Sequence, residues 1–498
     1  MDEEGVIRDL FSDSEKQRYA TLVKMETEAT STRTVEKDST VLLDEDVKKM
    51  LEVKVATLYH GPRREPNMRL KRVAEAKKQR ARICGWPKRV NEIVRKAYRS
   101  QMSLRDVVQI VDRTTKRYVI TADLTCSFWQ VEASEELIFR YGSNLFKFNR
   151  MNMGSVTSAE RMHMITTALA RFPGITEKCV VDIHIDNIRF QSDNKSLLQR
   201  LKTHLQQRFA KYNVTINDTI NVVEQHEFFG IRFNTAMPTA EIADKTREKL
   251  NDAKATIAGT MTLRQFLSLI GRTIYVSRAT RHSLDKHYIA LQFTRRLQKL
   301  ASQEVNLDQQ IKISTELQNH MAKWTQQLID AKPFSLADAP LRKVFLFTDA
   351  SDDGAGAVLI HRNTVHVFGS HFDNTTRRRH INTKELAAVT IALRAFAGLL
   401  KGTAITHFID NVAAAKALRT GHAPSFHMND ETSKILDECA RTGCKFTSSN
   451  YVKSAFNPAD RPSRGRRPAQ QAIEYMRKVI DSDVPYQYGG IGQDASHG

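Results

Sequence analysis

The sequence contains little cysteine, with five in 498 residues. They are Cys84, Cys126, Cys179, Cys439 and Cys444. So few and so scattered thiols exclude a disulfide scaffold and indicate a reducing compartment. Only Cys439 and Cys444 lie close together, and no second pair of Cys or His follows at zinc-ligand spacing. We therefore interpret these two as buried thiols and not as zinc ligands.

Long apolar segments are also missing. A membrane span needs roughly 18 uninterrupted apolar residues, and the best candidate, residues 386–400, is broken by Thr390 and Arg394. This segment predicts an amphipathic helix. The first four residues, Met-Asp-Glu-Glu, are acidic where a signal or transit peptide would be basic. The expectation is a protein of the cytoplasm or nucleus with no membrane partner.

Positive charge, by contrast, is in excess. The 76 Lys and Arg residues outnumber the 56 Asp and Glu residues, which gives a formal net charge of +20. Hydrophobic residues at 41% and charged residues at 27% are typical of a globular chain and exclude a wholly disordered one. The length predicts about three domains. The charge predicts a polyanionic partner, most often nucleic acid.

More than half of this net charge lies between residues 62 and 99, where fourteen Lys or Arg residues face three Glu. A solvated helix face usually mixes signs to avoid self-repulsion, so we interpret this basic stretch as a contact for a phosphate backbone. Residues 1–60 are charged and mixed, with one marginal helical stretch at 42–58, and predict a poorly packed extension.

The rest of the chain predicts two mixed units. Residues 118–234 alternate strand-like runs (118–124 and 227–233) and a hairpin (179–190) with helical runs (158–170 and 196–209), an α+β pattern. Residues 245–332 are largely helical. From 343 to 464 the pattern predicts strands at 344–348, 357–360, 365–369 and 405–409, and helices at 384–399 and 411–419. The residues beyond 466 form a polar tail.

Four acids in the second unit stand at the ends of predicted elements. Asp349 ends a strand, Glu385 lies in the first turn of a helix that Thr383 would cap, and Asp410 ends another strand. Asp460 follows in Asn-Pro-Ala-Asp-Arg-Pro-Ser-Arg. Each acid alone would be a capping or surface residue, but such ends meet at one edge of a sheet. Converging carboxylates are what two-metal hydrolysis of a phosphodiester requires, with the ions about 4 Å apart.

This second unit resembles the RNase H domain of retroelement polyproteins. The matching motifs are Thr-Asp-Ala-Ser at 348–351, Asn-Thr-Lys-Glu-Leu at 382–386, Ile-Asp-Asn at 409–411 and the motif around Asp460. The resemblance implies that Asp349, Glu385, Asp410 and Asp460 are metal ligands and that the substrate is the RNA strand of an RNA–DNA hybrid. Residues 380–386 look most like DIRS-type elements, including the VIPER group. The family often has a basic or histidine-bearing loop before the last acid, and this loop offers Lys453 and no histidine.

The first unit resembles a reverse transcriptase palm. Residues 121–130, Thr-Ala-Asp-Leu-Thr-Cys-Ser-Phe-Trp-Gln, look like motif A. The resemblance implies that Asp123 holds catalytic metal ions and that Phe128 is the aromatic gate that selects dNTPs; a core Phe-Trp pair is the alternative reading. Residues 151–155, Met-Asn-Met-Gly-Ser, resemble the family's Met-Pro-Phe-Gly-Leu, which assigns Met153 and Gly154 to substrate binding.

Residues 181–188, Val-Asp-Ile-His-Ile-Asp-Asn-Ile, fall where the family has Tyr-x-Asp-Asp. The resemblance implies that Asp186 keeps the first acid, whereas Asn187 replaces the second and His184 replaces the tyrosine. An amide carries no charge, so Asn187 weakens the attraction for Mg²⁺. Phe228-Phe229-Gly230 is similar to the turn that grips the primer strand.

Together these resemblances imply an α+β multidomain chain, a polymerase right hand of fingers, palm and thumb followed by an RNase H-like α/β domain. The expected domains are an N-terminal extension at 1–60, fingers and palm at 61–245, a helical thumb and connection at 246–335, RNase H at 340–465 and a basic, polar tail at 466–498. A basic residue of the fingers would contact the triphosphate. The sequence does not distinguish between four candidates: Arg80, Arg82, Lys88 and Arg89.

The implied activity is RNA-directed DNA polymerase with RNase H, using two Mg²⁺ or Mn²⁺ ions per active site. The implied partners are an RNA template, a DNA primer or RNA–DNA hybrid, dNTPs, and other retroelement-encoded proteins or a ribonucleoprotein complex. Two alternatives stay open. One is a domesticated RNA-binding protein with a weak or dead polymerase site, favoured by Asn187 and the altered residues at 151–155. The other is a nuclease with an inactive palm.

Overall fold

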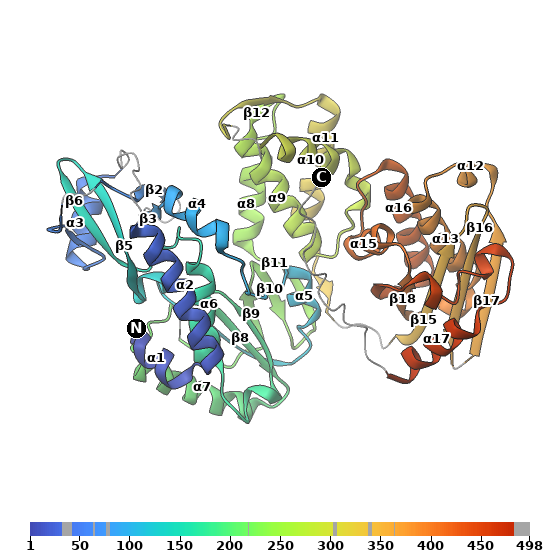
Figure 1. Cartoon of the computed structure of the whole chain (residues 1–498), viewed down its shortest axis with the longest axis horizontal. Helices are drawn as coiled ribbons and strands as arrows, with labels where there is room; N and C mark the ends of the chain where they lie inside the picture. The colour runs from blue at the N-terminus through green and yellow to red at the C-terminus, as the bar shows by residue number, and fades with distance from the viewer. Residues whose placement is uncertain are drawn as a thin grey trace. The chain divides into compact units, whose positions relative to one another are not determined.

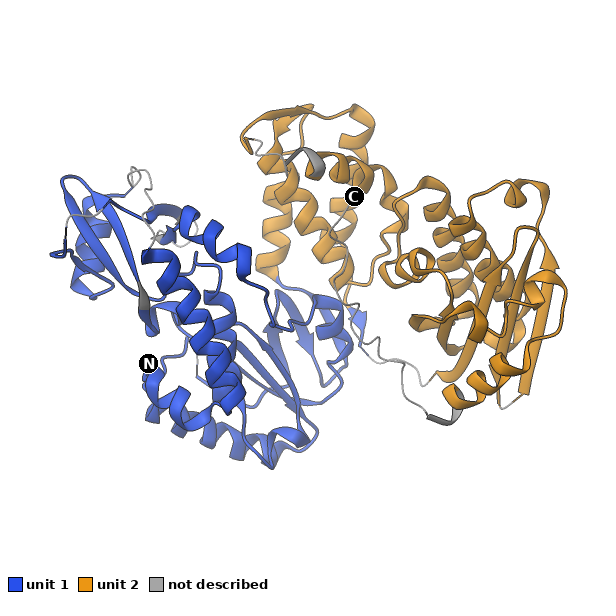
Figure 2. Cartoon of the chain, viewed as in Figure 1, with its two compact units in different colours: residues 1–243, 334–336 blue, residues 244–333, 337–498 orange. Residues whose placement is uncertain are grey.

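The structure is a computed structural model that describes residues 1–31, 42–62, 65–75, 80–217, 219–301, 306–336, 341–362 and 364–482. The chain divides into two compact units (Figure 2). Unit 1 comprises residues 1–243 with 334–336, and unit 2 comprises residues 244–333 with 337–498. The elements of both units are labelled in Figure 1.

Unit 1 is built around a three-stranded antiparallel sheet of order β4-β8-β7. Its strands are β4 (Tyr118–Asp123), β7 (Val180–His184) and β8 (Asn187–Ser192), and helices α6 (Ser158–Ala170) and α7 (Lys195–Lys211) pack against them. Apolar side chains of these elements, among them Ile120, Phe190 and Leu201, form the largest buried cluster of the unit. The strands and helices predicted at 118–124, 158–170, 179–190 and 196–209 are confirmed.

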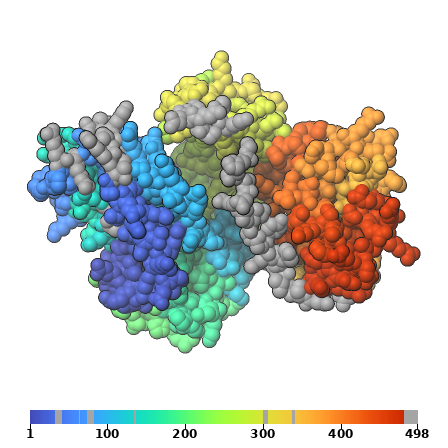
Figure 3. Space-filling view, viewed as in Figure 1, coloured from blue at the N-terminus to red at the C-terminus, as the bar shows by residue number. Residues whose placement is uncertain are grey.

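The N-terminal residues depart from the expectation of a poorly packed extension. Helices α1 (Glu3–Leu10) and α2 (Asp13–Ser31) place Val6, Phe11 and Tyr19 in the same buried cluster as the sheet. In Figure 3 the dark-blue N-terminal residues form part of the surface of unit 1. The prediction failed because charged residues occupy the outer faces of both helices and dilute the apolar signal.

The remaining elements of unit 1 form smaller sheets and short helices. One sheet has the order β1-β6-β5, a two-stranded one pairs β2 with β3, and a four-stranded one has the order β14-β11-β10-β9. Their bounds are β1 (Ala56–Leu58), β2 (Arg69–Glu75), β3 (Arg80–Trp86), β5 (Glu132–Tyr141), β6 (Asn144–Arg150), β9 (Gln225–Phe228), β10 (Ile231–Asn234), β11 (Thr239–Ile242) and β14 (Phe334–Ser335), with helices α3 (Asp44–Glu52), α4 (Lys88–Ala97) and α5 (Val107–Asp112).

The strand predicted at 227–233 is two strands. Phe229 and Gly230 have φ angles of 57° and 66°, so the backbone turns back on itself between β9 and β10. Glycine adopts this left-handed conformation readily, and a phenylalanine beside it does so only in a tight turn. The hydrophobic side chains at 228, 231 and 233 gave a continuous apolar signal across the turn that the resemblance of Phe228-Phe229-Gly230 indicated.

Unit 2 begins with the helical region predicted at 245–332, which is confirmed. It contains α8 (Asp244–Lys254), α9 (Leu263–Ala279), α10 (Tyr288–Ala301) and α11 (Thr315–Ile329), with a short hairpin of β12 (Thr260–Thr262) and β13 (Gln310–Lys312). Trp324 of α11 is buried and donates a hydrogen bond from its indole nitrogen to Ser277 of α9 at 2.9 Å. This contact joins two helices of the region.

The second part of unit 2 is a five-stranded sheet of order β17-β16-β15-β18-β19. The first three strands are antiparallel neighbours, and β15, β18 and β19 are parallel. The strands are β15 (Arg342–Ala350), β16 (Gly354–His361), β17 (Thr364–His371), β18 (Thr403–Ile409) and β19 (Lys445–Tyr451), and the helices are α12 (Asn374–Arg377), α13 (Ile381–Ala395), α14 (Ala397–Leu400), α15 (Val412–Thr420), α16 (Phe426–Thr442) and α17 (Gln470–Ser482).

Apolar side chains cover both faces of this sheet. Leu346 and Leu359 belong to a buried cluster with residues of α13, α15 and α16, while Phe347 and Val358 belong to a second cluster that includes Met476 of α17. Residues 470–482, expected to be part of a polar tail, therefore form a helix packed on the sheet. Its polar residues lie on the outer face, which is why the sequence alone suggested a tail.

The prediction of a mixed α+β fold with an α/β domain in the C-terminal half is confirmed. Among the described residues, no helix combines the length and the apolar character needed to cross a membrane. Cys439 and Cys444 are both free and buried, as expected.

Candidate active site

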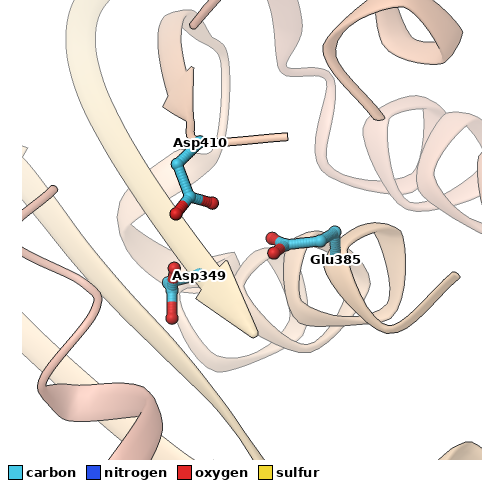
Figure 4. Close-up of side chains that lie close together, drawn as sticks. All are labelled: Asp349, Glu385 and Asp410. Carbon is cyan, nitrogen blue, oxygen red and sulfur yellow. The ribbon is translucent and has the colours of Figure 1, made fainter. Parts of the chain in front are cut away.

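Three of the predicted acids converge in unit 2. Carboxylate oxygens of Asp349, Glu385 and Asp410 lie within 4.8 Å of one another. Figure 4 shows the three side chains pointing toward one space from two strand ends and a helix. This group is the one cluster of three or more potential metal ligands among the residues that the structure describes.

The sheet register explains why the two aspartates meet. Strands β15 and β18 are parallel neighbours, and Thr348 pairs with Ile409. Asp349 and Asp410 follow these paired residues, so both carboxylates emerge at the same edge. Glu385 comes from α13, whose N-cap is His380 and not Thr383. The helix begins at Ile381, which places Glu385 in its second turn and not in its first as the sequence suggested.

The electrostatics of this cluster are dominated by burial and by repulsion between the acids, which the charge of Arg464 opposes only in part. Burial, and then the nearby charge of Asp410, raises the pKa of Asp349 to about 7. Burial, and then the charge of Asp349, raises the pKa of Glu385 to about 10. Asp349 Oδ2 and Glu385 Oε2 are buried and have no hydrogen-bond partner among the described residues. Buried carboxylate oxygens of this kind fit a divalent cation, whose charge would remove the repulsion.

Asp460 lies close to this group but is not one of its three members. Its charge is among the causes that raise the pKa of Asp349, and its Oδ1 accepts a hydrogen bond from Arg464 at 3.3 Å. The loop that carries Asp460 packs directly on the sheet. A Cβ atom added to Gly356 of β16 would lie 2.3 Å from the backbone of Ala459 and of Ser463, so glycine is required for this close approach.

The structure adds one polar contact that the sequence analysis did not identify. Ser454 donates a hydrogen bond from its hydroxyl group to Oδ2 of Asp410. Ser454 directly follows Lys453, the residue that the resemblance singled out, yet the serine is the one that contacts the acid. A hydroxyl at this sequence position carries no signal by itself, because only the turn after β19 brings it to Asp410.

A second group of acids, the pair Asp123 and Asp186, lies in unit 1. Asp123 ends β4 and pairs across the sheet with Asn187, the residue after Asp186. The amide nitrogen of Leu124 also donates to the carbonyl oxygen of Asp186 at 3.2 Å. The hairpin β7–β8 therefore brings Asp186 beside the end of β4, as the sequence predicted.

Neutral polar groups contact both of these acids. Ser127 donates to Oδ2 of Asp186 at 2.9 Å, and the side-chain amide of Asn187 donates to Oδ1 at 2.9 Å. Asn217 donates from its side-chain amide to Oδ2 of Asp123 at 2.6 Å. Ser127 and Asn217 were not identified from the sequence. Asn217 is about ninety residues from Asp123, and no local pattern connects the two.

The other predicted binding residues of unit 1 have different environments. Phe128 is 7% exposed and belongs to the buried cluster of the sheet, which supports the alternative reading as a core residue. Its role as a gate stays a prediction. Met153 is 49% exposed. Gly154 lies so near β3 that a Cβ atom would be 1.9 Å from the carbonyl oxygen of Gly85.

The four basic candidates lie on β3 and α4. Lys88 and Arg89 are exposed residues in the first turn of α4, and Lys88 is 3.8 Å from Glu92. Arg80 and Arg82 belong to β3, but their side chains fall outside the described part of the structure. Their assignment to the triphosphate stays a prediction.

Comparison with known proteins gives one match to a family. Residues 339–434 match the RNase H-like domain found in reverse transcriptase. This range contains Asp349, Glu385 and Asp410, while Asp460 lies beyond it. The search of curated proteins found no match.

Solved structures that resemble the chain include foamy viral protease-reverse transcriptases. The one in complex with an RNA/DNA hybrid has a TM-score of 0.49 and 14% identity, over 91% of this chain and 62% of that chain. A second, the dRH form with double-stranded DNA, has a TM-score of 0.48 and 14% identity, over 91% and 81%. A third, also with double-stranded DNA, has a TM-score of 0.47 and 14% identity, over 91% and 96%.

Proposed function

We propose, from the RNase H-like match over residues 339–434 and the acids that converge within it, that this chain is a reverse transcriptase with RNase H activity. Unit 1 would copy an RNA template into DNA. The sheet domain of unit 2 would degrade the RNA strand of the resulting hybrid. The observation that carries the proposal is the convergence of Asp349, Glu385 and Asp410 within 4.8 Å.

In the nuclease site, Asp349, Glu385 and Asp410 would hold divalent cations, Mg²⁺ or Mn²⁺, with Asp460 completing the set. When bound, two such ions supply an activated water and charge stabilisation for the leaving oxygen. Ser454 fixes the orientation of Asp410 through its hydrogen bond. Burial of Asp349 and Glu385 lowers the local dielectric and strengthens their attraction for a cation.

In the polymerase site, Asp123 and Asp186 would be the metal ligands. Ser127, Asn187 and Asn217 orient their carboxylates by donating hydrogen bonds. With Asn187 in place of a third acid, this site has less negative charge than a site with three carboxylates. We therefore propose that it binds metal more weakly than the nuclease site does.

The partners proposed for the chain are an RNA template, a DNA primer, dNTPs and an RNA–DNA hybrid. The basic residues of β2, β3 and α4 would contact the phosphate backbone. The sequence His-Ile-Asn-Thr-Lys-Glu-Leu at 380–386 supports a DIRS/VIPER-like retroelement as the source. Cytoplasm or nucleus would be the site of action, with other element-encoded proteins as further partners.

The proposal is tested by measuring primer extension and hybrid cleavage on one preparation, first with Mg²⁺ and then with Mn²⁺. We expect Asp349→Asn to abolish cleavage and leave extension intact, and Asp123→Asn to do the reverse. Absence of both activities in the wild-type protein would contradict the proposal and favour an RNA-binding role.

A nuclease without polymerase activity is the second candidate, and Asn187 is the observation that favours it. Its amide donates to Asp186 where the family has an acid. Cleavage without extension in either metal would support this candidate. If Asn187→Asp then restored extension, the loss of activity would be assigned to this one residue.

A further inference from the structure

The loop between β6 and α6, residues 152–157, is held by two buried side chains from elsewhere in unit 1. The first is Asn91 of α4, which is 4% exposed. Its side-chain amide donates to the carbonyl oxygen of Gly154 at 2.8 Å, and its oxygen accepts from the backbone nitrogen of Val156 at 3.0 Å. One amide thus satisfies a backbone acceptor and a backbone donor two residues apart.

The second side chain is Glu26 of α2, a carboxylate that is 1% exposed. Its Oε1 accepts a hydrogen bond from the backbone nitrogen of Thr157 at 3.2 Å, and its Oε2 accepts one from Arg161 at 3.4 Å. Thr157 is the N-cap residue of α6, and its own side chain makes no capping hydrogen bond. Glu26 therefore places an anion at this helix start from a separate helix, where the helix dipole favours one.

A further set of hydrogen bonds connects α2 and α4 to α6. Glu160 of α6 is 2% exposed and accepts hydrogen bonds from Arg18 of α2 and from Tyr98, the C-cap residue that follows α4, both at 2.8 Å. Burial raises the pKa of Glu160, but these two bonds, the charge of Arg18 and a hydrogen bond from the backbone nitrogen of Gln101 together leave the pKa below its usual value. The carboxylate thus stays charged and links three helices.

The loop also lacks room to move toward β3. Gly154 packs against the backbone of Gly85, with 1.9 Å between its ideal Cβ position and the carbonyl oxygen. Met153, by contrast, is 49% exposed. The hydrogen bonds from Asn91 and Glu26 hold backbone atoms of the loop, and the Met153 side chain stays accessible to a ligand.

We propose that Glu26 and Asn91 are positioning residues for the nucleotide and template contact of loop 152–157, and that helix α2 is thereby an integral part of the polymerase site. This inference rests on the proposed function of unit 1. A purely structural role would require burial of α2 only, which Leu22 and Tyr19 already provide. Two buried polar side chains aimed at three backbone atoms of one loop instead fix its conformation.

The experiment measures primer extension as a function of dNTP concentration in wild type, Glu26→Ala, Glu26→Gln and Asn91→Ala. We expect the alanine variants to raise the KM for dNTP about tenfold, because hydrogen bonds to a charged or buried group are lost. Glu26→Gln keeps an acceptor for Thr157 and should fall between. The matched control is Glu28→Ala, since Glu28 lies on the same helix with 68% of its side chain exposed.

Hybrid cleavage and the melting temperature are measured on each preparation. If an alanine variant lowers only kcat, in proportion to the folded fraction, with KM unchanged, the two residues are merely structural and the inference is overturned. If Glu26→Ala does not fold, the KM for dNTP of Glu26→Gln and of Asn91→Ala decides instead. An unchanged KM in both would again overturn the inference.

Hydrogen exchange at the amides of residues 154–157 gives a readout independent of polymerase activity. We expect faster exchange there in Glu26→Ala, with no change in α7. A wild-type protein that cleaves hybrids but extends no primer would contradict the polymerase assignment. In that case, equal exchange rates in wild type and Glu26→Ala would also show that Glu26 does not fix the loop. Faster exchange in the variant would show that Glu26 fixes the loop without a role in polymerase activity.

Discussion

At the scale of single residues, the acids were predictable and their partners were not. Asp349, Glu385 and Asp410 each follow a recognisable local pattern, an apolar strand or the start of a helix. Ser454 and Asn217 contact acids through loops that are distant in sequence. A serine or asparagine in a loop has no periodicity to mark it, so only the folded chain identifies these contacts.

The contact of Ser454 with Asp410 predicts an effect on the nuclease. Ser454→Ala removes the hydroxyl that orients the carboxylate, and we expect the cleavage rate of an RNA–DNA hybrid to fall about tenfold, the effect of one lost hydrogen bond to a charged group. Steady-state cleavage at saturating Mg²⁺ measures it. Ser370→Ala, at an exposed position of β17, is the control. Equal rates in both variants would show that Asp410 needs no such support.

At the scale of elements, strands and helices with strong apolar periodicity were predicted well, and elements with polar outer faces were missed. The core strands of both sheets and helix α6 occur where the pattern placed them. Helices α1, α2 and α17 were interpreted as extensions because charged residues dominate their composition. Their stability comes from tertiary packing of one apolar face, which a composition-based analysis underestimates.

His407 joins three strands of the unit 2 sheet. It is fully buried on β18, and its ring nitrogens lie 2.9 Å from the hydroxyl groups of Thr348 on β15 and of Ser449 on β19. Burial lowers the pKa of His407 to about 3. Its neutral form is therefore the folded form, and the stability that it contributes is present above the unfolded pKa of about 6.5 and is lost as the pH falls toward 3.

We expect His407→Leu to destabilise the protein by about 2–4 kcal/mol at pH 7, because two buried hydroxyl groups lose their partner. The variant should also lose less stability between pH 6.5 and pH 4 than the wild type does. Urea unfolding of both proteins across this pH range measures it. His371→Leu, at an exposed position of β17, should match the wild type in both respects.

The approach of the Asp460 loop to β16 gives a second prediction at this scale. Gly356→Ala places a methyl group 2.3 Å from backbone atoms of Ala459 and Ser463, which cannot rotate away. We expect the loop to be displaced, with the hybrid cleavage rate reduced at least tenfold and the melting temperature lowered. Gly398→Ala is the control, since nothing lies within 4 Å of its Cβ position. An active Gly356→Ala variant would show that the position of the loop is unimportant for cleavage.

At the scale of the whole molecule, the carboxylate cluster of unit 2 predicts how stability depends on pH and metal. The raised pKa values of Asp349 and Glu385 mean that the folded state holds protons which the unfolded state releases near pH 4. Without divalent ions, these groups therefore cost stability as the pH rises, from about 4 through 7 for Asp349 and from about 4 through 10 for Glu385, on the order of a few kcal/mol. A bound cation would remove this cost.

We expect Mg²⁺ to raise the melting temperature of the protein at pH 8 and to have little effect at pH 5. Asp349→Asn should be more stable than the wild type in the absence of metal at pH 8, and its melting temperature should no longer respond to Mg²⁺. Thermal unfolding with EDTA or with Mg²⁺ at both pH values measures this. A metal response of equal size at pH 5 and pH 8 would contradict the assignment of the raised pKa values to the cluster.

The short strand β14 bears on how the chain can be divided. After the helices of residues 244–333, the chain returns to pair Phe334 with Ala240 of β11, and the backbone nitrogen of Leu336 donates to Pro238 at 2.7 Å. A fragment that stops at Pro333 therefore leaves the outer edge of β11 bare, ready to pair with other molecules. Stopping after Leu336 instead retains the protective strand, so a fragment that contains unit 1 and these helices should end at Leu336 and not at Pro333.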